Sequence, residues 1–206
     1  MRKLTKEQEA IELGKVWMKK SKDPTHDYGH AQRVTQNALK VFEELKENQP
    51  ERFKEIDPGL VKLLGWWHDC YKARFEKASF RDLFIEGRES ELIFRDEMKN
   101  YLKPERLEKV AYAISNHQKV FLYVFRFGKI PPLLRIIFEA DGLDAMRRDR
   151  HKMIIGQNPN IFRKLFSFGM HQFMTIFYKL FLPFTEYGRN TFKRNKAIKP
   201  LNVPLD

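Results

Sequence analysis

The sequence contains little cysteine and no long hydrophobic run. Its 206 residues include one cysteine, Cys70, so the fold cannot rest on internal disulfides. The longest apolar tract near the end, 173–184, is interrupted by Lys179 and Pro183 and is shorter than the roughly 20 residues that cross a bilayer. The opening segment, MRKLTKEQEAIELG, holds no apolar stretch of signal-peptide length. We therefore expect a cytoplasmic protein.

Acidic residues are few relative to basic ones. There are 39 Lys and Arg against 27 Asp and Glu, a formal net charge of +12. The excess is concentrated late: from Ala145 onward, twelve basic residues oppose three acidic ones, a net of +9. This distribution predicts an anionic partner, which could be a phosphorylated small molecule, nucleic acid or an acidic membrane surface. The charge alone does not choose among them.

Strand-like alternation is absent, whereas helix signals recur along the chain. Thr5 and Gln8 form a capping box that opens a helix reaching about Lys20. Asp57 and Pro58 are an N-cap and a first-turn proline, which predict another helix start. Further helices are expected around the apolar stripe from His30 to Leu45, from Glu89 to Leu102 after a loop at Gly87, from Pro104 to His117, and from Pro132 through Asp141. The chain is predicted to be all-α.

One domain spanning 1–206 is expected, with a basic, Phe-rich helical extension at about 155–206 packed on it. The chain has 18 phenylalanines, and five of them follow one another largely at four-residue steps: Phe162, Phe166, Phe173, Phe177 and Phe181. Such spacing favours a buried helical face. The alternatives are a dimer surface, a face on an anionic membrane, or a stacking surface for single-stranded nucleic acid.

Histidine and aspartate occur at three places where a helical bundle could bring them together. His30 lies on the apolar stripe of the second predicted helix, His68 and Asp69 close the apolar segment before them, and Asp141 follows another apolar run. A charged aspartate after such a run is costly to bury unless it is paired or coordinates a cation. Each has a plainer interpretation: His30 could be a core histidine, the His-Asp pair is common, and Asp141 could cap a helix or pair with Arg135.

Together, two imidazoles and two carboxylates form a nitrogen and oxygen donor set for a divalent first-row metal or Mg²⁺. Four ligands leave positions open for water and substrate. A bound cation lowers the pKa of its water from about 15.7 toward 7 and polarises a phosphoryl oxygen.

The order of these residues resembles the HD superfamily of metal-dependent phosphohydrolases, in the bacterial branch with a His-Asp-x-x-His motif. The match extends beyond four letters: it includes His26–Val34 (HDYGHAQRV), Trp67–Asp69 (WHD), Ala113–His117 (AISNH) and Ala140–Ala145 (ADGLDA). The resemblance implies an all-helical HD domain of about six to eight helices. It makes His30, His68, Asp69 and Asp141 the metal ligands, with Asp69 also catalytic.

Other roles are more open. His117 is expected to bind phosphate or to donate a proton, and its alternative is a buried hydrogen-bonding histidine. Lys72 stands near the place where several nucleotide-hydrolysing relatives carry a catalytic acid; it could hold a phosphate as a point charge, or be surface. His26 is a further candidate for substrate binding. Arg33 is expected to be an ion-pair partner within the bundle, and Asp144 to support the site or cap a turn rather than to bind metal.

Between Asp69 and His117 the sequence has no histidine. Two-metal HD relatives use extra histidines in that interval, so we expect one divalent ion, which could be Mn, Mg, Fe, Ni, Co or Zn. The predicted function is hydrolysis of a phosphoester or phosphoanhydride, in a nucleotide or similar small molecule, by metal-activated water. The alternatives are a catalytically idle HD module that binds a nucleotide or nucleic acid, and an HD-type di-iron oxygenase. A homodimer is compatible with the sequence.

Overall fold

The computed structural model describes residues 3–74, 82–119, 130–147, 149–150 and 185–196. The described residues form eight α-helices and one short 3₁₀ helix, with no strand among them, which confirms the predicted all-α class. The elements are α1 (Lys6–Lys19), α2 (Tyr28–Asn48), α3 (Pro50–Phe53), α4 (Pro58–Trp67), η1 (Lys72–Arg74), α5 (Asp82–Met98), α6 (Pro104–Asn116), α8 (Pro132–Ala145) and α11 (Glu186–Lys196).

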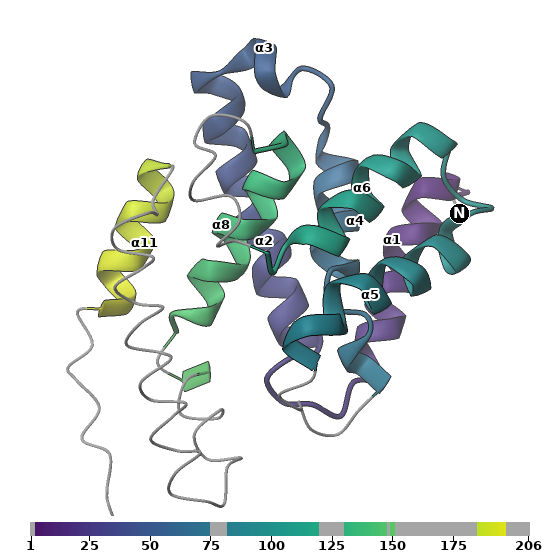
Figure 1. Ribbon diagram of the computed structural model, residues 1–206. Coiled ribbons are helices and arrows are strands. Elements are labelled where there is room, and N and C mark those ends of the chain that lie inside the picture. The colour runs from purple at the N-terminus through teal and green to yellow at the C-terminus, as the bar shows by residue number, and fades with distance from the viewer. Residues whose placement is uncertain (1–2, 75–81, 120–129, 148, 151–184, 197–206) are drawn as a thin grey trace, which may run out of the picture.

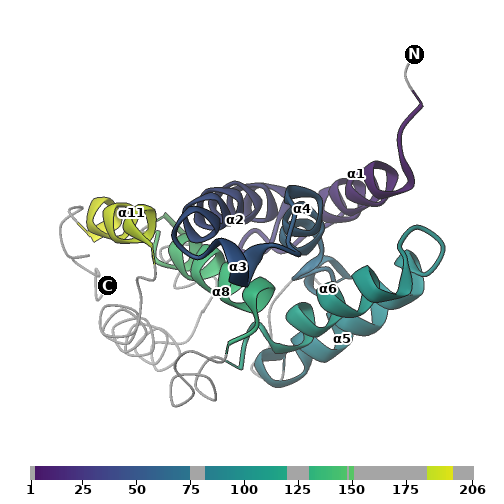
Figure 2. The ribbon, with the colours of Figure 1, turned by 90° about the horizontal axis from the view of Figure 1, so that it is seen from above.

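The described helices form two layers. Seen from above, α11, α2, α4 and α1 lie side by side in one layer, and α8, α6 and α5 lie beneath them (Figures 1 and 2). The long helix α2 is central because it packs against α4 within its layer and against α8 in the other. Within the second layer, α5 packs on α6 and α6 contacts α8.

A glycine allows α2 and α4 to approach closely. A Cβ at Gly65 would lie 2.5 Å from the Thr35 side-chain oxygen and 2.8 Å from the Thr35 Cα. Cβ atoms in proteins do not come that close to other heavy atoms. At the present distance between α2 and α4, only glycine therefore fits at position 65. The close contact places the beginning of α2 beside the end of α4, where the predicted metal ligands lie.

Most predicted helix boundaries are confirmed. The Thr5–Gln8 capping box opens α1, and the Asp57 side chain accepts hydrogen bonds from the backbone N–H groups of Gly59 and Leu60 at the start of α4. The prediction of a loop at Gly87 was wrong, because α5 begins at Asp82 and continues through this residue. A Cβ on Gly87 would meet the Ser115 carbonyl oxygen at 2.7 Å, so this glycine permits helix contact rather than ending a helix. The short helix α3 was not anticipated.

The C-terminal part of the described chain packs on the bundle. Helix α11 contacts α2 and α8. The Tyr187 hydroxyl donates to Asn37 Oδ1 at 2.7 Å, and Phe192 packs against the core. The five phenylalanines of the predicted stripe lie outside the described residues. Within the described part, no helix combines the length and apolarity that a membrane crossing requires.

Candidate metal centre

The predicted ligands gather at the end of the bundle where α2 begins and α4 ends. His30 lies in the first turn of α2, whose N-cap, Asp27, accepts a 2.8 Å hydrogen bond from the His30 backbone N–H. His68 and Asp69 directly follow α4. All three of His30, His68 and Asp69 are almost fully buried. The cap at Asp27 thus fixes the first turn of α2, which carries His30. The close contact of α2 and α4 at Gly65 places His68 and Asp69 beside it.

Three donor atoms converge there. His30 Nε2 lies 3.2 Å from His68 Nε2 and 3.0 Å from Asp69 Oδ2. His68 Nε2 is 3.2 Å from the same Asp69 oxygen. Each of the three residues offers one donor atom to a shared point, as a metal ligand set requires.

The hydrogen bonds of the two rings define which nitrogens are available. His30 Nδ1 lies 2.7 Å from the Asp144 carboxylate, and His68 Nδ1 lies 2.9 Å from the Gly65 carbonyl. Both partners are acceptors, so each Nδ1–H donates to its partner and each ring turns its Nε2 toward the other ring and toward the Asp69 carboxylate. Two imidazole nitrogens and a carboxylate oxygen that converge in this way form an arrangement that can hold a cation. The donor set therefore fits a divalent metal ion.

Asp141 lies at the open side of this group. Its Oδ1 is 3.7 Å from His30 Nε2, and its side chain is 27% exposed. The alternative pairing with Arg135 is wrong: Asp141 instead lies 3.4 Å from the guanidinium of Arg150. Burial raises the pKa of Asp141, but Arg150 and His30 outweigh this and lower it below its ordinary value. Asp141 is therefore an ionised carboxylate beside the convergent donors.

Asp144 lies directly behind His30, where it could support the site. Besides His30 Nδ1, its carboxylate accepts hydrogen bonds from Arg33 Nε at 2.6 Å and from Arg150 at 3.2 Å. Arg33 is thus the expected ion-pair partner. Although burial disfavours the charged form, these partners hold the pKa of Asp144 well below its usual range. A carboxylate behind a ligating histidine fixes the ring tautomer and strengthens the nitrogen as a donor.

His117, predicted to bind phosphate or donate a proton, faces the same centre from the end of α6. Its Nδ1 donates to the Ile114 carbonyl at 2.6 Å, which leaves Nε2 facing Asp69 Oδ1 at 3.3 Å. Burial lowers the pKa of His117, but the hydrogen bond and charge of Asp69 outweigh it and raise the pKa to about 9. The position is suitable for holding a proton at Nε2.

Lys72 is buried, which excludes the surface alternative. It is 2% exposed, and its ammonium nitrogen lies 3.1 Å from Glu86 Oε2 on α5. Glu86 was not among the residues predicted from the sequence, because it stands in the polar segment EGRES, where nothing in the hydrophobic pattern indicates burial. Burial and the nearby Asp69 carboxylate raise the pKa of Glu86 to about 7.

His26, the remaining predicted site residue, also lies beside the centre. Its ring makes an edge contact with that of His30 at a centroid distance of 5.6 Å. His26 Nδ1 lies 2.8 Å from Asp23 Oδ2, and Asp23 is buried. Burial disfavours the Asp23 carboxylate, but its contacts with His26 and Thr25 lower the Asp23 pKa far below its usual range. His26 and Asp141, with side chains 17% and 27% exposed, mark the side that solvent reaches.

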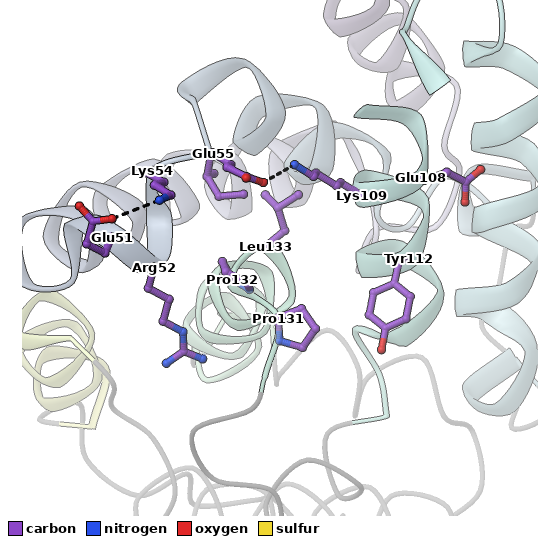
Figure 3. A pocket seen from close by; sticks show the side chains of 11 residues that line it. Glu51, Arg52, Lys54, Glu55, Glu108, Lys109, Tyr112, Pro131, Pro132 and Leu133 are labelled. Carbon is purple, nitrogen blue, oxygen red and sulfur yellow. Dashed lines mark hydrogen bonds and ion pairs between the residues drawn. The ribbon is translucent and has the colours of Figure 1, made fainter. Parts of the chain in front are cut away.

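A separate pocket lies between the α3 region, α6 and the beginning of α8 (Figure 3). Its volume is about 590 Å³, and it shares no residue with the His/Asp cluster. Charged side chains at its rim pair with one another: Lys54 with Glu51 at 3.2 Å, and Lys109 with Glu55 at 2.7 Å. None of its described lining residues is a histidine. The His/Asp cluster is therefore the stronger candidate for chemistry.

Comparisons with known proteins agree with this geometry. A family model for the HD domain matches residues 27–146, which include His30, His68, Asp69, His117 and Asp141. No curated protein and no solved structure matches the chain. HD domains bind divalent metals, and most act as metal-dependent hydrolases. Since the matched segment covers more than half of the sequence and contains the clustered histidines and aspartates, the chain belongs to the HD domain family.

Proposed function

We propose that this HD protein is a phosphohydrolase that cleaves a phosphoester or phosphoanhydride bond in a small molecule, specifically a nucleotide. The observation that supports the proposal most strongly is the convergence of His30 Nε2, His68 Nε2 and Asp69 Oδ2 within 3.2 Å of one another. Asp141 beside them completes the proposed ligand set. The net charge of +12 favours an anionic substrate.

His30, His68, Asp69 and Asp141 would hold a divalent cation, which would supply an activated water and polarise a phosphoryl oxygen. The chain itself contributes the surroundings of the reaction. Asp144 fixes the His30 ring, and the Gly65 carbonyl fixes the His68 ring, so neither ligand has to reorganise. Substrate approaches from the side of Asp141 and His26, where the centre is open to solvent.

Basic groups around the centre are suited to a phosphoryl group. The Arg150 guanidinium and the Lys72 ammonium are both buried beside acidic partners, where their positive charge is poorly screened. We propose that Lys72 and Arg150 stabilise charge on the phosphoryl oxygens and that His117 gives a proton from Nε2 to the leaving oxygen. His26 contributes to binding of the substrate at the open side.

Phosphate release from a panel of nucleotides tests the proposal. The full chain is stripped with a chelator and assayed with nucleoside mono-, di- and triphosphates before and after addition of Mn²⁺ or Mg²⁺. We expect release that depends on the added metal and is lost in Asp69→Ala, because that variant lacks an anionic ligand. Activity of Asp69→Ala equal to wild type, at metal concentrations near the dissociation constant, would refute the role of this residue.

The same assay separates the proposal from its alternative. An idle HD module would bind nucleotides in a metal-dependent way without releasing product. Tight binding of a nucleotide with no phosphate release across the panel would therefore reject the hydrolase and favour a nucleotide-binding sensor.

A further inference from the structure

The pocket between the α3 region, α6 and the beginning of α8 is a second place where a small molecule could bind. Its volume of about 590 Å³ lies within the range of roughly 300–1,000 Å³ that small-molecule sites occupy. Its walls come from three segments that lie far apart in the sequence (Figure 3). Because it shares no residue with the His/Asp cluster, a ligand in this pocket would bind apart from the metal centre.

Much of the lining of this pocket is apolar. Ile56 and Leu133 are 6% and 4% exposed, and the rings of Pro131 and Pro132 lie beside them. Tyr112 on α6 adds an aromatic ring, and this residue is 46% exposed. A ligand ring that packs against such a lining removes apolar surface from water and gains an aromatic contact. The pocket is therefore suited to a ligand that contains an aromatic ring.

The acidic side chains of the lining are already paired. Each of the three glutamates has a basic partner within ion-pair distance: Glu51 pairs with Lys54 at 3.2 Å, Glu55 with Lys109 at 2.7 Å, and Glu108 with Arg95. These pairs use both lysines of the lining. A ligand that carries a positive charge would have to compete for a carboxylate that is already neutralised.

Arg52 is the exception among the charged residues of the lining. Its guanidinium donates to the Ile130 carbonyl at 2.7 Å and to the Gln49 side-chain oxygen at 3.4 Å, and it lies 6.0 Å from the centre of the Phe53 ring. None of these groups carries a negative charge, and no ion pair of Arg52 occurs among the described residues. Figure 3 shows its side chain directed away from Glu51, beside Pro131. The pocket thus contains one positive charge that no carboxylate balances.

A second arginine adds to the positive potential at this side of the pocket. Arg135 donates from Nη1 to the same Gln49 oxygen at 3.3 Å, and it is 9% exposed. Burial and the charge of Arg52 lower the pKa of Arg135 below its ordinary value, although Glu139 opposes them. An anion beside Arg52 would reduce the repulsion between the two guanidinium groups.

We propose that this pocket binds an aromatic carboxylate, with its ring against Tyr112 and the two prolines and its carboxylate on Arg52. A guanidinium suits a carboxylate because two parallel N–H groups can bond both oxygens. One negative charge balances Arg52, whereas a doubly charged phosphate would meet added repulsion from the glutamates at the rim. The proposal does not rest on the hydrolase function, since the pocket and the metal centre have no residue in common.

Fluorine NMR with para-trifluoromethyl benzoate tests this site. The probe is titrated with the chelator-stripped full chain, so that no metal ion can bind its carboxylate. We expect saturable binding of one benzoate per chain. The matching benzamide, which keeps the ring and lacks the charge, should bind roughly tenfold or more weakly, because it loses a charged hydrogen bond to Arg52. Equal affinity for the two probes, or no binding of the benzoate, would overturn the proposal.

Three variants locate the probe within the pocket. Arg52→Gln should weaken benzoate binding by roughly tenfold or more and leave benzamide binding unchanged. Tyr112→Ala should weaken both probes, and it gives an independent result if Arg52→Gln does not fold. Lys54→Gln is the matched control, because it removes a cation from the same lining that Glu51 already neutralises, so benzoate should bind nearly as in wild type.

Two outcomes of the variant series would contradict the assignment. Wild-type affinity for the benzoate in either Arg52→Gln or Tyr112→Ala, with the variant folded, would place the probe elsewhere. An equal loss of affinity in Lys54→Gln and Arg52→Gln would show attraction to the general charge of the surface instead of a bond to Arg52, and would also overturn the proposal.

Discussion

At the scale of single residues, the centre depends on what lies behind each ligand. Asp144 is fully buried, accepts from His30 Nδ1 and pairs with three arginines, Arg33, Arg147 and Arg150. It contributes no atom to the His30–His68–Asp69 group itself. Its effect on a bound metal is therefore expected to act through the His30 ring.

The variant Asp144→Asn should lower the affinity for the tightly bound ion by about 10–100-fold, the usual loss when an outer partner of a metal ligand is removed. The amide can still accept from His30, but it lacks the charge that strengthens the ring as a donor. Competition with a chelator measures the dissociation constant. Asp96→Asn is the control, because Asp96 is exposed and pairs with Lys99. Equal affinity in the two variants would contradict the role of Asp144.

Sequence patterns indicated the candidate ligands, but not the residues that surround them. His30, His68 and Asp69 stand on or next to strongly apolar segments, where a polar side chain needs a reason to be buried, and the structure brings these three together. Glu86 and Asp23 stand in polar segments whose burial depends on contacts between distant helices. Neither spacing nor hydrophobicity could indicate them.

At the scale of helices, the centre depends on how closely α2 and α4 approach. Gly65 contacts the backbone of Thr35, and its carbonyl accepts the Nδ1–H of His68. A larger residue at this position has to separate the two helices that hold His30 and His68. We therefore expect substitution to affect both stability and metal binding.

The variant Gly65→Ala should lose at least about 1 kcal/mol of unfolding free energy, because overpacking costs about 1–3 kcal/mol and exceeds the gain in helix propensity. Urea denaturation measures the change. Gly59→Ala is the control: a Cβ there meets chiefly the carboxylates of Glu7 and Asp57, and the partly exposed Glu7 side chain can move away. Gly65→Ala as stable as wild type would show that the helices tolerate separation.

A buried acid joins α8 to the beginning of α11. Glu139 is fully buried and accepts a hydrogen bond from the Thr185 hydroxyl, and its burial raises the pKa to about 7 from 4.5. Between these two values the unfolded chain has lost the proton that the folded chain still holds. Stability therefore falls as pH rises through this window, by about 1.4 kcal/mol per pH unit and about 3 kcal/mol in all, and is constant above pH 7.

Glu139→Gln should remove this part of the pH dependence and be more stable than wild type at pH 8. Unfolding free energies measured from pH 4.5 to 8 test it, with the exposed Glu47→Gln as control. A difference between wild type and Glu139→Gln that does not change with pH would contradict the assignment.

The helix boundaries show what sequence can predict at this scale. Thr5, Asp57 and the first-turn prolines of α4, α6 and α8 were identified because capping is local. The loop predicted at Gly87 was wrong for a different reason. Gly87 allows α5 to approach the Ser115 carbonyl, which lies far along the chain, and local sequence does not distinguish such a glycine from one in a loop.

At the scale of the whole molecule, the C-terminal segment is expected to belong to the folded body. Thr185 is buried, Tyr187 bonds to Asn37, and Phe192 packs against the core. At about 25 cal/mol per Å², burial of a few aromatic rings contributes several kcal/mol. This is comparable to the net stability of a domain, roughly 5–15 kcal/mol.

A chain that ends at Asn158 should therefore be unstable or insoluble. Thermal unfolding and gel filtration of the truncated protein measure this. A soluble, monomeric and fully active product would show that the segment is not core. Vesicle binding that weakens with salt would then test the membrane alternative for the Phe-rich stretch.

The central claim is that His30, His68, Asp69 and Asp141 hold a divalent metal. The most direct measurement is the metal content of the full chain by elemental analysis, after purification and after stripping and reconstitution, in parallel with His68→Ala. We predict one tightly bound ion per chain in the wild type and its loss in the variant. A wild-type protein that neither retains nor regains metal would contradict the account.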